Sequence, residues 1–283
     1  MSNVIIPNEE RLERIKKEMQ KQGFKKLHIL ADFDRTLTYS QSNKNENISS
    51  IVSILRNGNY LSNEYTKEAH ALFDRYHPLE IDPTIPINEK KKAMQEWWTL
   101  HSKLLIKSGL NKKDIEAIVG TGIIKLRDKT KELFDYLHQK QVPLVIISSS
   151  GVGNAIPMFL EKEGIYYDNI HIITNLYTFD NNGKATNISK PIIHVMNKDE
   201  TVIHDYPEIY NKIKDRKNVI LLGDSLGDLG MAIGFNYDNL LKIGFLNPGE
   251  EQNQKEYEKN FDVIITNDSD IQPVNKLIRE ISE

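Results

Sequence analysis

The chain has 283 residues, of which 39% are hydrophobic and 27% are charged, and its formal net charge is −3. This composition is ordinary for a water-soluble protein with a large core, and it lacks the basic excess of nucleic-acid-binding proteins. The chain has no cysteine, which excludes disulfides, thiolate metal sites and a cysteine nucleophile. No apolar run approaches the roughly 20 residues that span a bilayer, and residues 1–20 lack a signal-peptide core. We therefore expect a cytoplasmic protein with no membrane or nucleic-acid partner.

The first predicted elements are a helix and a strand. Asn8 can cap a helix that ends near Gln22, because Leu12, Ile15 and Met19 follow helical spacing. The apolar run 27–31 then reads as a buried parallel strand. Ligand sites in open α/β sheets lie at the carboxyl ends of such strands, so the residues that follow this run are the first candidates for a ligand site.

Two aspartates, Asp32 and Asp34, follow that strand. Residues i and i+2 of a strand point to the same face, and two carboxylates placed in this way repel each other. A divalent cation relieves the repulsion, and an oxygen-only environment suits magnesium. The alternative for either residue alone is an aspartate that caps the next helix.

Residues 41–120 interrupt the alternation of strands and helices. The Asn-rich stretch 41–50 is predicted to be a loop, and residues 78–86 and Gly109 are predicted to separate helices. We interpret 41–120 as an all-helical cap inserted into a core formed by 1–40 and 121–283. The helical patterns lie near residues 47–57, 62–76, 89–108 and 111–119.

Alternation resumes after residue 120, which predicts an α/β fold with a parallel sheet and helices on both faces. Residues 177–189 look like a hairpin. The predicted helices cover 127–141, 151–164 and 206–214, and the predicted strands cover 142–148, 171–175, 218–222, 241–245 and 263–265.

Three further segments carry polar groups at or near strand ends. Ser149 and Ser150 begin a Ser/Gly-rich turn that either binds an anion at a helix N-terminus or is a plain turn with a serine cap. Asp224 ends another strand, and Asp228 lies in the first turn after it. Lys198 lies in a polar turn and would ordinarily be a solvated surface residue, but the four aspartates need a fixed cation.

Taken together, DFDRTLT, SSSG, Lys198 and GDSLGD resemble, in order and spacing, the four motifs of the haloacid dehalogenase (HAD) superfamily of phosphatases, whose core is Rossmann-like. The stretches HPLEIDP, EWWTLHSKLL, IIHVMNKDE and NVILLGDSLGDLGMA are similar to the cytosolic 5′-nucleotidase III group, the pyrimidine 5′-nucleotidases. The resemblance covers roughly residues 24–280. It implies a 5′-nucleotidase, a phosphoric monoester hydrolase.

The resemblance also assigns chemical roles to the aspartates. Asp32 matches the nucleophile, and Asp34 matches the acid/base that protonates the leaving nucleoside oxygen and then activates water. Mg²⁺ would be held by the Asp32 carboxylate, the Asp34 backbone carbonyl and Asp224, with Asp228 in support. This reading requires the Asp32 and Asp224 carboxylates to lie within about 8 Å of each other.

The resemblance further implies the substrate-binding residues. Ser149 and Lys198 match residues that hold the phosphate, whereas Ser150 stands where members of the family have alanine. Glu80 matches the carboxylate that reads the nucleobase, and Trp98 and His101 fall at base-contacting positions. Because Glu80 can accept hydrogen bonds from an exocyclic amino group, we expect CMP and 7-methylguanosine monophosphate to be better substrates than UMP.

Two alternatives remain open at this stage. One is an HAD phosphatase that acts on another small phosphomonoester, such as phosphoserine or a sugar phosphate. The other is a non-catalytic phospho-acceptor or binding module, although such receivers lack a helical cap and an acid at the position of Asp34. The tryptophans allow two interpretations as well, because Trp97 and Trp98 can be cap core or can stack on a base. We expect a monomer or a weak dimer.

Overall fold

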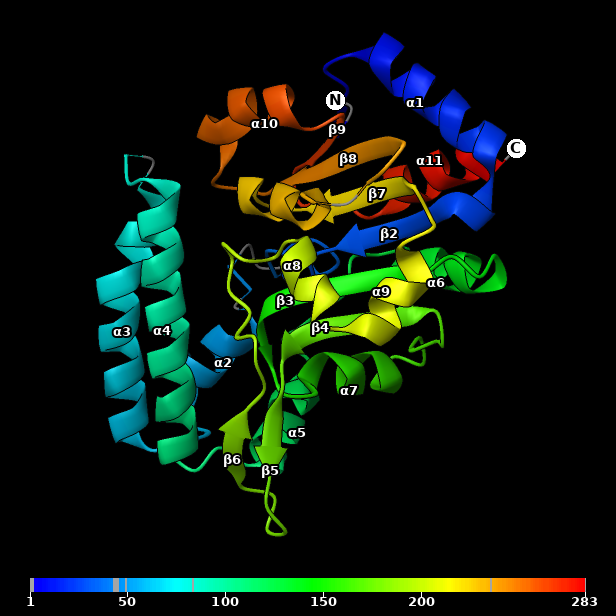
Figure 1. Ribbon diagram of the computed structural model, residues 1–283. Helices are drawn as coiled ribbons and strands as arrows, with labels where there is room; N and C mark the ends of the chain where they lie inside the picture. The colour runs from blue at the N-terminus through cyan, green and yellow to red at the C-terminus, as the bar shows by residue number, and fades with distance from the viewer. Residues whose placement is uncertain (1–2, 43–45, 49, 83, 235, 283) are drawn as a thin grey trace.

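A seven-stranded sheet runs through the middle of the molecule in the computed structural model (Figure 1), which describes residues 3–42, 46–48, 50–82, 84–234 and 236–282. All neighbouring strands are parallel except β1, which pairs antiparallel with β9 at one edge. In spatial order the strands are β1 (Val4–Ile5), β9 (Val263–Thr266), β8 (Asn239–Leu246), β7 (Asn218–Gly223), β2 (Leu27–Ala31), β3 (Leu144–Val152) and β4 (Ile170–Asn175).

Helices cover both faces of this sheet, as the sequence predicts. Alternate strand residues point to opposite faces, so Ile29 packs in one apolar cluster and Leu30 in the other. The Ile29 cluster includes side chains from α1 (Glu9–Gln22), α6 (Thr130–Gln139), α7 (Ala155–Lys162) and α11 (Gln272–Ser282). The Leu30 cluster includes side chains from α8 (Glu200–His204), α9 (Pro207–Ile213) and α10 (Gln254–Asn260).

The described residues between β2 and β3 form four helices: α2 (Ile51–Asn57), α3 (Asn63–Ile81), α4 (Ile87–Lys107) and α5 (Lys112–Gly120). The long helices α3 and α4 pack side by side as a hairpin beyond the carboxyl ends of the strands (Figure 1). Whether residues 41–120 form a separate cap domain stays a prediction. The small hairpin β5 (Tyr177–Phe179) and β6 (Ala185–Ile188) contacts α4.

The largest differences from the predicted boundaries lie at residues 78–86, 41–50 and 151–164. The break predicted at residues 78–86 is wrong for its first part, because α3 continues through Pro78 to Ile81. A proline so near the C-terminus removes one donor, and the last turn still closes through Asp82 N–H and the Pro78 carbonyl at 3.1 Å. Glu80 therefore lies on a helix. The predicted loop 41–50 lies partly outside the described residues, and α2 begins at Ile51.

The helix predicted at residues 151–164 is shorter, because β3 runs on to Val152 and α7 begins at Ala155. Gly151 makes this extension feasible, since a Cβ there would lie 2.0 Å from Thr174 Oγ1 on β4. Ser149 and Ser150 are therefore strand residues. Two short elements, β1 and α8, were not predicted. None of the helices within the described residues is both long and apolar enough to cross a membrane.

Candidate active site

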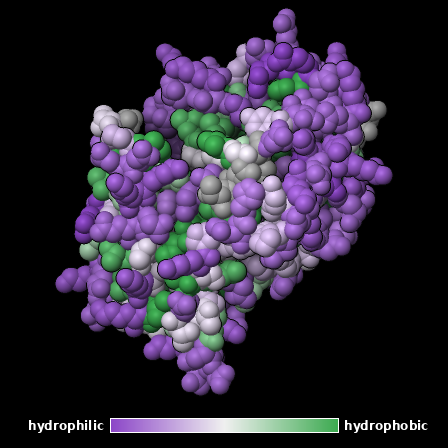
Figure 2. Space-filling model, in the orientation of Figure 1, coloured by the Kyte–Doolittle hydropathy of each residue, from purple (hydrophilic) through white to green (hydrophobic). Residues whose placement is uncertain are grey.

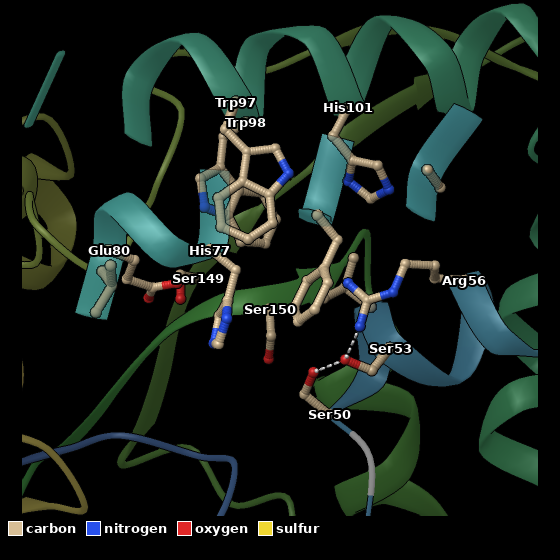
Figure 3. A pocket seen from close by; sticks show the side chains of 14 residues that line it. Ser50, Ser53, Arg56, His77, Glu80, Trp97, Trp98, His101, Ser149 and Ser150 are labelled. Atoms are coloured by element: carbon tan, nitrogen blue, oxygen red, sulfur yellow. Dashed lines mark hydrogen bonds between the residues drawn. The ribbon is translucent and has the colours of Figure 1, made fainter. Parts of the chain in front are cut away.

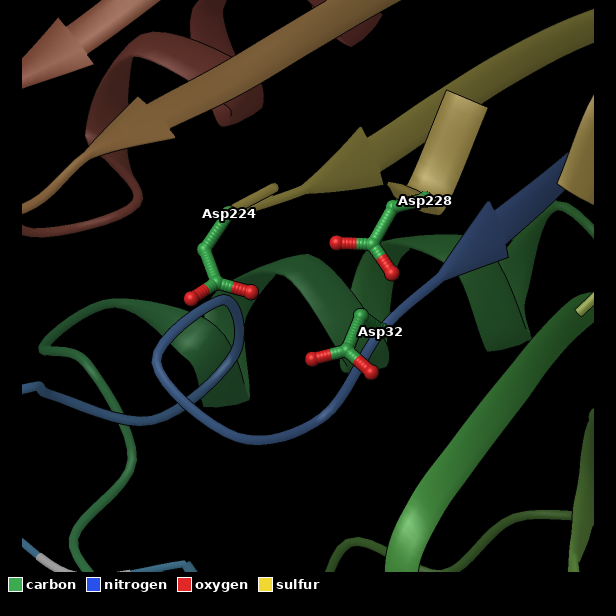
Figure 4. A group of neighbouring side chains, drawn as sticks. All are labelled: Asp32, Asp224 and Asp228. Atoms are coloured by element: carbon green, nitrogen blue, oxygen red, sulfur yellow. The ribbon is translucent and has the colours of Figure 1, made fainter. Parts of the chain in front are cut away.

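Three carboxylates meet where β2 and β7 end side by side. Asp32 follows β2 and Asp224 follows β7, and the Asp32 N–H donates to the Leu222 carbonyl on β7 at 3.0 Å. Oxygens of Asp32, Asp224 and Asp228 all lie within 4.8 Å of one another, and Figure 4 shows the three side chains grouped beyond the ends of the two strands. This separation is well inside the distance of about 8 Å that a shared cation requires.

Lys198 supplies a positive charge to this cluster. Its ammonium donates to the Asp32 carboxylate and to Asp228 Oδ1, the latter at 3.0 Å. Only 4% of Lys198 is exposed. Burial alone would lower the pKa of Lys198, but the charges of Asp228 and Asp32 raise it above its usual value, so the side chain is a permanent cation.

Asp228 is held rigidly by the turn in which it lies, at the start of the 3₁₀ helix Leu226–Ala232. Its Oδ2 accepts hydrogen bonds from the Ser225 N–H at 3.0 Å and the Ser225 hydroxyl at 2.8 Å. Gly223 leaves the necessary space, because a Cβ at that residue would lie 2.5 Å from the Asp228 Cβ. Lys198 and Ser225 therefore use both oxygens of Asp228, which suits a supporting role.

Burial and mutual repulsion raise the pKa values of the other two acids. For Asp32, burial raises the pKa to about 7, with Lys198 opposing and Asp228 adding to the shift. For Asp224, burial and then the charges of Asp228 and Asp32 raise the pKa well above its usual value. Arg35 Nε lies 3.9 Å from Asp224 Oδ2 and offsets part of this charge. The cluster thus has more negative than positive groups at short range.

Asp34 faces a different partner. Its carboxylate accepts a hydrogen bond from the Ser150 hydroxyl, which connects the end of β2 with β3. Burial raises the pKa of Asp34, and the hydrogen bond from Ser150 opposes the rise. Asp34 therefore lies beside the group formed by Asp32, Asp224 and Asp228, and its carboxylate is not part of that group.

The chain after Asp34 is fixed by Arg127, a fully buried arginine that precedes α6. Its guanidinium donates to the carbonyls of Arg35 at 2.7 Å and Thr36 at 2.8 Å, and also to Asn247 Oδ1 at 2.8 Å. Arg35 has a φ of 63°, which lies in the left-handed region that non-glycine residues rarely adopt. Arg127 therefore stabilises the turn at Arg35 and Thr36, which directly follows Asp34.

A cavity of about 190 Å³ extends from β3 to the α3–α4 hairpin (Figure 3). Ser149 and Ser150 line it on the sheet side, while Glu80, Trp97, Trp98 and His101 line it on the hairpin side. Burial raises the pKa of Glu80, with the charges of Lys198 and Lys90 opposing. Both tryptophans line the cavity, and Trp98 also packs against the main core.

His101 is a buried residue of α4 whose Nε2 lies 3.1 Å from the Tyr65 hydroxyl on α3. Burial lowers the pKa of His101 to about 4, so its ring is neutral at physiological pH. The hydrogen bond connects the two helices of the hairpin. His101 thus has a structural partner in addition to its place on the cavity wall.

Comparison with known proteins is consistent with this geometry. The family model for pyrimidine 5′-nucleotidase (UMPH-1) matches residues 35–282. The chain belongs to the pyrimidine 5′-nucleotidase family.

Several relatives resemble this nucleotidase over nearly its whole length. A 7-methylguanosine phosphate-specific 5′-nucleotidase from Gallus gallus is 35% identical over 281 residues, which are 99% of this chain and 96% of the relative. The Homo sapiens protein of the same name is 33% identical, covering 99% of this chain and 93% of the relative. The crystal structure of cytosolic 5′-nucleotidase IIIB bound to cytidine matches with a TM-score of 0.91 at 30% identity, covering 99% of this chain and 94% of that one.

More distant structures share the fold of this nucleotidase. A phosphoserine phosphohydrolase-like protein from Francisella tularensis matches with a TM-score of 0.51 at 17% identity, covering 89% of this chain and 99% of that one. The α/β fold predicted from the sequence, with a parallel sheet and helices on both faces, is confirmed. The predicted activity class is confirmed as well, and the chain is a 5′-nucleotidase.

The cavity residues of this nucleotidase that the sequence analysis missed include Arg56, Phe73 and His77. Phe73, His77 and Glu80 are spaced at i, i+4 and i+7, which places them on one face of α3. That spacing could have revealed the first two once Glu80 was suspected. Arg56 lies in the last turn of the short helix α2, where an arginine is common, and no sequence signal marks it.

Proposed function

We propose that this enzyme hydrolyses nucleoside 5′-monophosphates in a Mg²⁺-dependent reaction through an aspartyl-phosphate on Asp32. The main support is that one cavity is lined both by Glu80 and Trp98 and by Ser149 and Ser150, which lie beside the carboxylate cluster. A nucleotide can therefore place its base under the α3–α4 hairpin and its phosphate at the strand ends. The relatives that are named for nucleotides support the same substrate class. Those named cytosolic support a cytoplasmic location.

The donor set fits magnesium. Asp32 and Asp224 offer buried carboxylate oxygens within 4.8 Å of each other, and their pKa values are raised first by burial and then by neighbouring negative charges, which a cation would offset. We assign Asp32, the Asp34 carbonyl and Asp224 to the ion and Asp228 to its support. The ion would supply Lewis-acid neutralisation of the phosphate charge.

Asp32 and Asp34 would carry out the reaction in two steps, phosphoryl transfer to Asp32 and hydrolysis of the aspartyl-phosphate. An Asp32 oxygen attacks phosphorus, the bond from phosphorus to the 5′ oxygen breaks, and Asp34 gives its proton to that oxygen. Asp34 then takes a proton from a water molecule that attacks the aspartyl-phosphate, which releases phosphate and restores Asp32. Lys198 and Ser149 hold the phosphoryl oxygens throughout. Burial, which raises the pKa of Asp34, favours its starting protonated form.

Asp32→Asn tests this mechanism. Because the amide is a poor nucleophile, we expect phosphate release from CMP with Mg²⁺ to fall by at least about a thousandfold, and chelation of Mg²⁺ should abolish the wild-type activity. Asp205→Asn, which changes an exposed aspartate outside the cluster, should leave the activity unchanged. Full activity of Asp32→Asn would refute the assignment.

A substrate panel separates this function from that of a general phosphatase. Because uracil lacks an amino group that could donate a hydrogen bond to Glu80, we expect CMP and 7-methylguanosine monophosphate to exceed UMP by about tenfold in kcat/KM. Phosphoserine should be a poor substrate. Equal rates on CMP, UMP, AMP and 7-methylguanosine monophosphate would exclude Glu80 and Trp98 as discriminators.

A further inference from the structure

Arg56 places a positive charge on the wall of the cavity. Its guanidinium carbon lies 4.1 Å from the centre of the Phe73 ring, and one terminal nitrogen donates to the Ser53 hydroxyl at 3.2 Å. Its Nε is buried and has no hydrogen-bond partner within the described chain. No carboxylate among the described residues forms an ion pair with it, and Asp74 acts on it only at longer range.

The position of Arg56 in the cavity is well defined. The Phe73 ring lies under the guanidinium and stacks on the His77 ring at 4.5 Å with an interplanar angle of 18°. Figure 3 shows Glu80 at one end of the cavity and Arg56 at the other, with the tryptophans on a common wall. The cavity therefore presents an acceptor at one end and a cationic donor at the other.

The charge of Arg56 already acts on other groups of the cavity. Burial lowers the pKa of His77 and of His101, and the Arg56 charge lowers both further. A positively charged nucleobase bound between these side chains would meet the same unfavourable field. A neutral base would not.

We propose that Arg56 is a specificity-determining residue that makes this cavity select neutral nucleobases with both an amino donor and a carbonyl acceptor, cytosine above all, over cationic 7-methylguanine. The amino group of cytosine is directed to Glu80, and its carbonyl accepts from the Arg56 guanidinium. The cationic ring gains from Glu80 and the tryptophans but loses to Arg56. This inference rests on the proposed function, since it assumes that the cavity holds the base of the substrate.

The test measures binding of nucleosides that have no phosphate, so that it does not depend on catalysis. Cytidine and 7-methylguanosine are titrated by calorimetry into the wild type, Arg56→Gln and Arg56→Lys, in slightly acidic buffer that keeps the methylated ring cationic. Because two like charges inside a protein repel strongly, Arg56→Gln should raise the affinity for 7-methylguanosine relative to cytidine by about tenfold. Arg56→Lys keeps the charge and should keep the wild-type ratio.

Arg75→Gln is the matched control, because Arg75 likewise lies over an aromatic ring but belongs to α3, is exposed and does not line the cavity. It removes the same net charge and should leave the ratio unchanged. An unchanged ratio in Arg56→Gln, an equal change in Arg75→Gln, or no binding of either nucleoside would overturn the inference. Nucleosides that bind while no nucleotide is hydrolysed would instead overturn the proposed function, and the ratio would still decide the role of Arg56.

Discussion

At the scale of the residue, His28 shows how burial turns an ordinary side chain into a source of pH dependence. It is the second residue of β2 and is 1% exposed, and its Nδ1 donates to the Arg216 carbonyl at 2.7 Å. Burial lowers the pKa of His28 to about 4. The folded protein therefore keeps this ring neutral under conditions in which the unfolded chain would protonate it.

The sign of the effect follows from linkage. Between the usual pKa of histidine and the lowered one, the unfolded chain binds a proton that the folded chain does not, so the stability falls as the pH falls. For His28 this amounts to about 2 kcal/mol between pH 7.5 and pH 5. His28→Asn keeps a donor for the Arg216 carbonyl but cannot titrate. We predict that its free energy of unfolding, from urea titrations, changes by about 2 kcal/mol less over this interval than that of the wild type.

A second histidine variant controls for general effects of the substitution. His70→Asn changes a residue of α3 away from the sheet, and it should keep the pH dependence of the wild type. The interpretation of His28 would be wrong if the His28→Asn and wild-type curves were parallel. Burial of the His101 ring acts in the same direction, so some pH dependence should survive in His28→Asn.

The site residues differ in how far the sequence could predict them. Asp32 and Asp224 could be grouped from the sequence because each follows a predicted strand, whereas Lys198 lies in a polar turn and was singled out only because the aspartates need a fixed cation. The partner of Asp34 could not be predicted, since Ser150 reaches it only because β3 continues past the predicted end of the strand. Arg56 depends on the packing of α2 against α3, which no local pattern specifies.

At the scale of the element, the extension of β3 is what places the serines at the mouth of the cavity. The sequence indicated a turn at Gly151 because serine and glycine are typical of turns. The structure instead uses Gly151 for close contact with β4, after an irregularity in the register between Ile147 and Val152. Local propensity was overridden by the pairing of the two strands.

Gly151→Ala tests this packing. The added methyl group would meet Thr174 Oγ1, so the two strands must separate, and we predict a loss of about 1–3 kcal/mol in the free energy of unfolding. The value of kcat should fall as well, since Ser149 and Ser150 would move. Thermal unfolding and CMP turnover measure the two effects.

The companion variants identify the cause. Adding Thr174→Ala removes the clashing oxygen and should restore part of the lost stability. Gly120→Ala, at the end of α5 where a Cβ would meet nothing within 4 Å, should be neutral or slightly stabilising. If Gly151→Ala behaved like Gly120→Ala, the close contact would not limit the sheet.

At the scale of the whole molecule, the site is assembled from segments far apart in the chain. The alternation of strands and helices predicted a parallel sheet, but it could not give the strand order that sets β7 and β3 on either side of β2. Contacts between distant segments complete the assembly. For example, Nζ of Lys91 on α4 lies 3.8 Å from Oδ2 of Asp199, the residue that follows Lys198 in the sequence. Such pairs depend on the folded arrangement and leave no trace in local sequence.

The central claim is that Asp32 accepts the phosphoryl group while it shares a magnesium ion with Asp224. A crystal structure of the enzyme with Mg²⁺ and beryllium trifluoride, which mimics a phosphoryl group on an aspartate, measures this directly. We predict beryllium bonded to an Asp32 oxygen and one metal ion coordinated by Asp32 and Asp224, at about 2.1 Å from each oxygen. Beryllium on any other residue, or a metal ion that coordinates neither aspartate, would contradict the account.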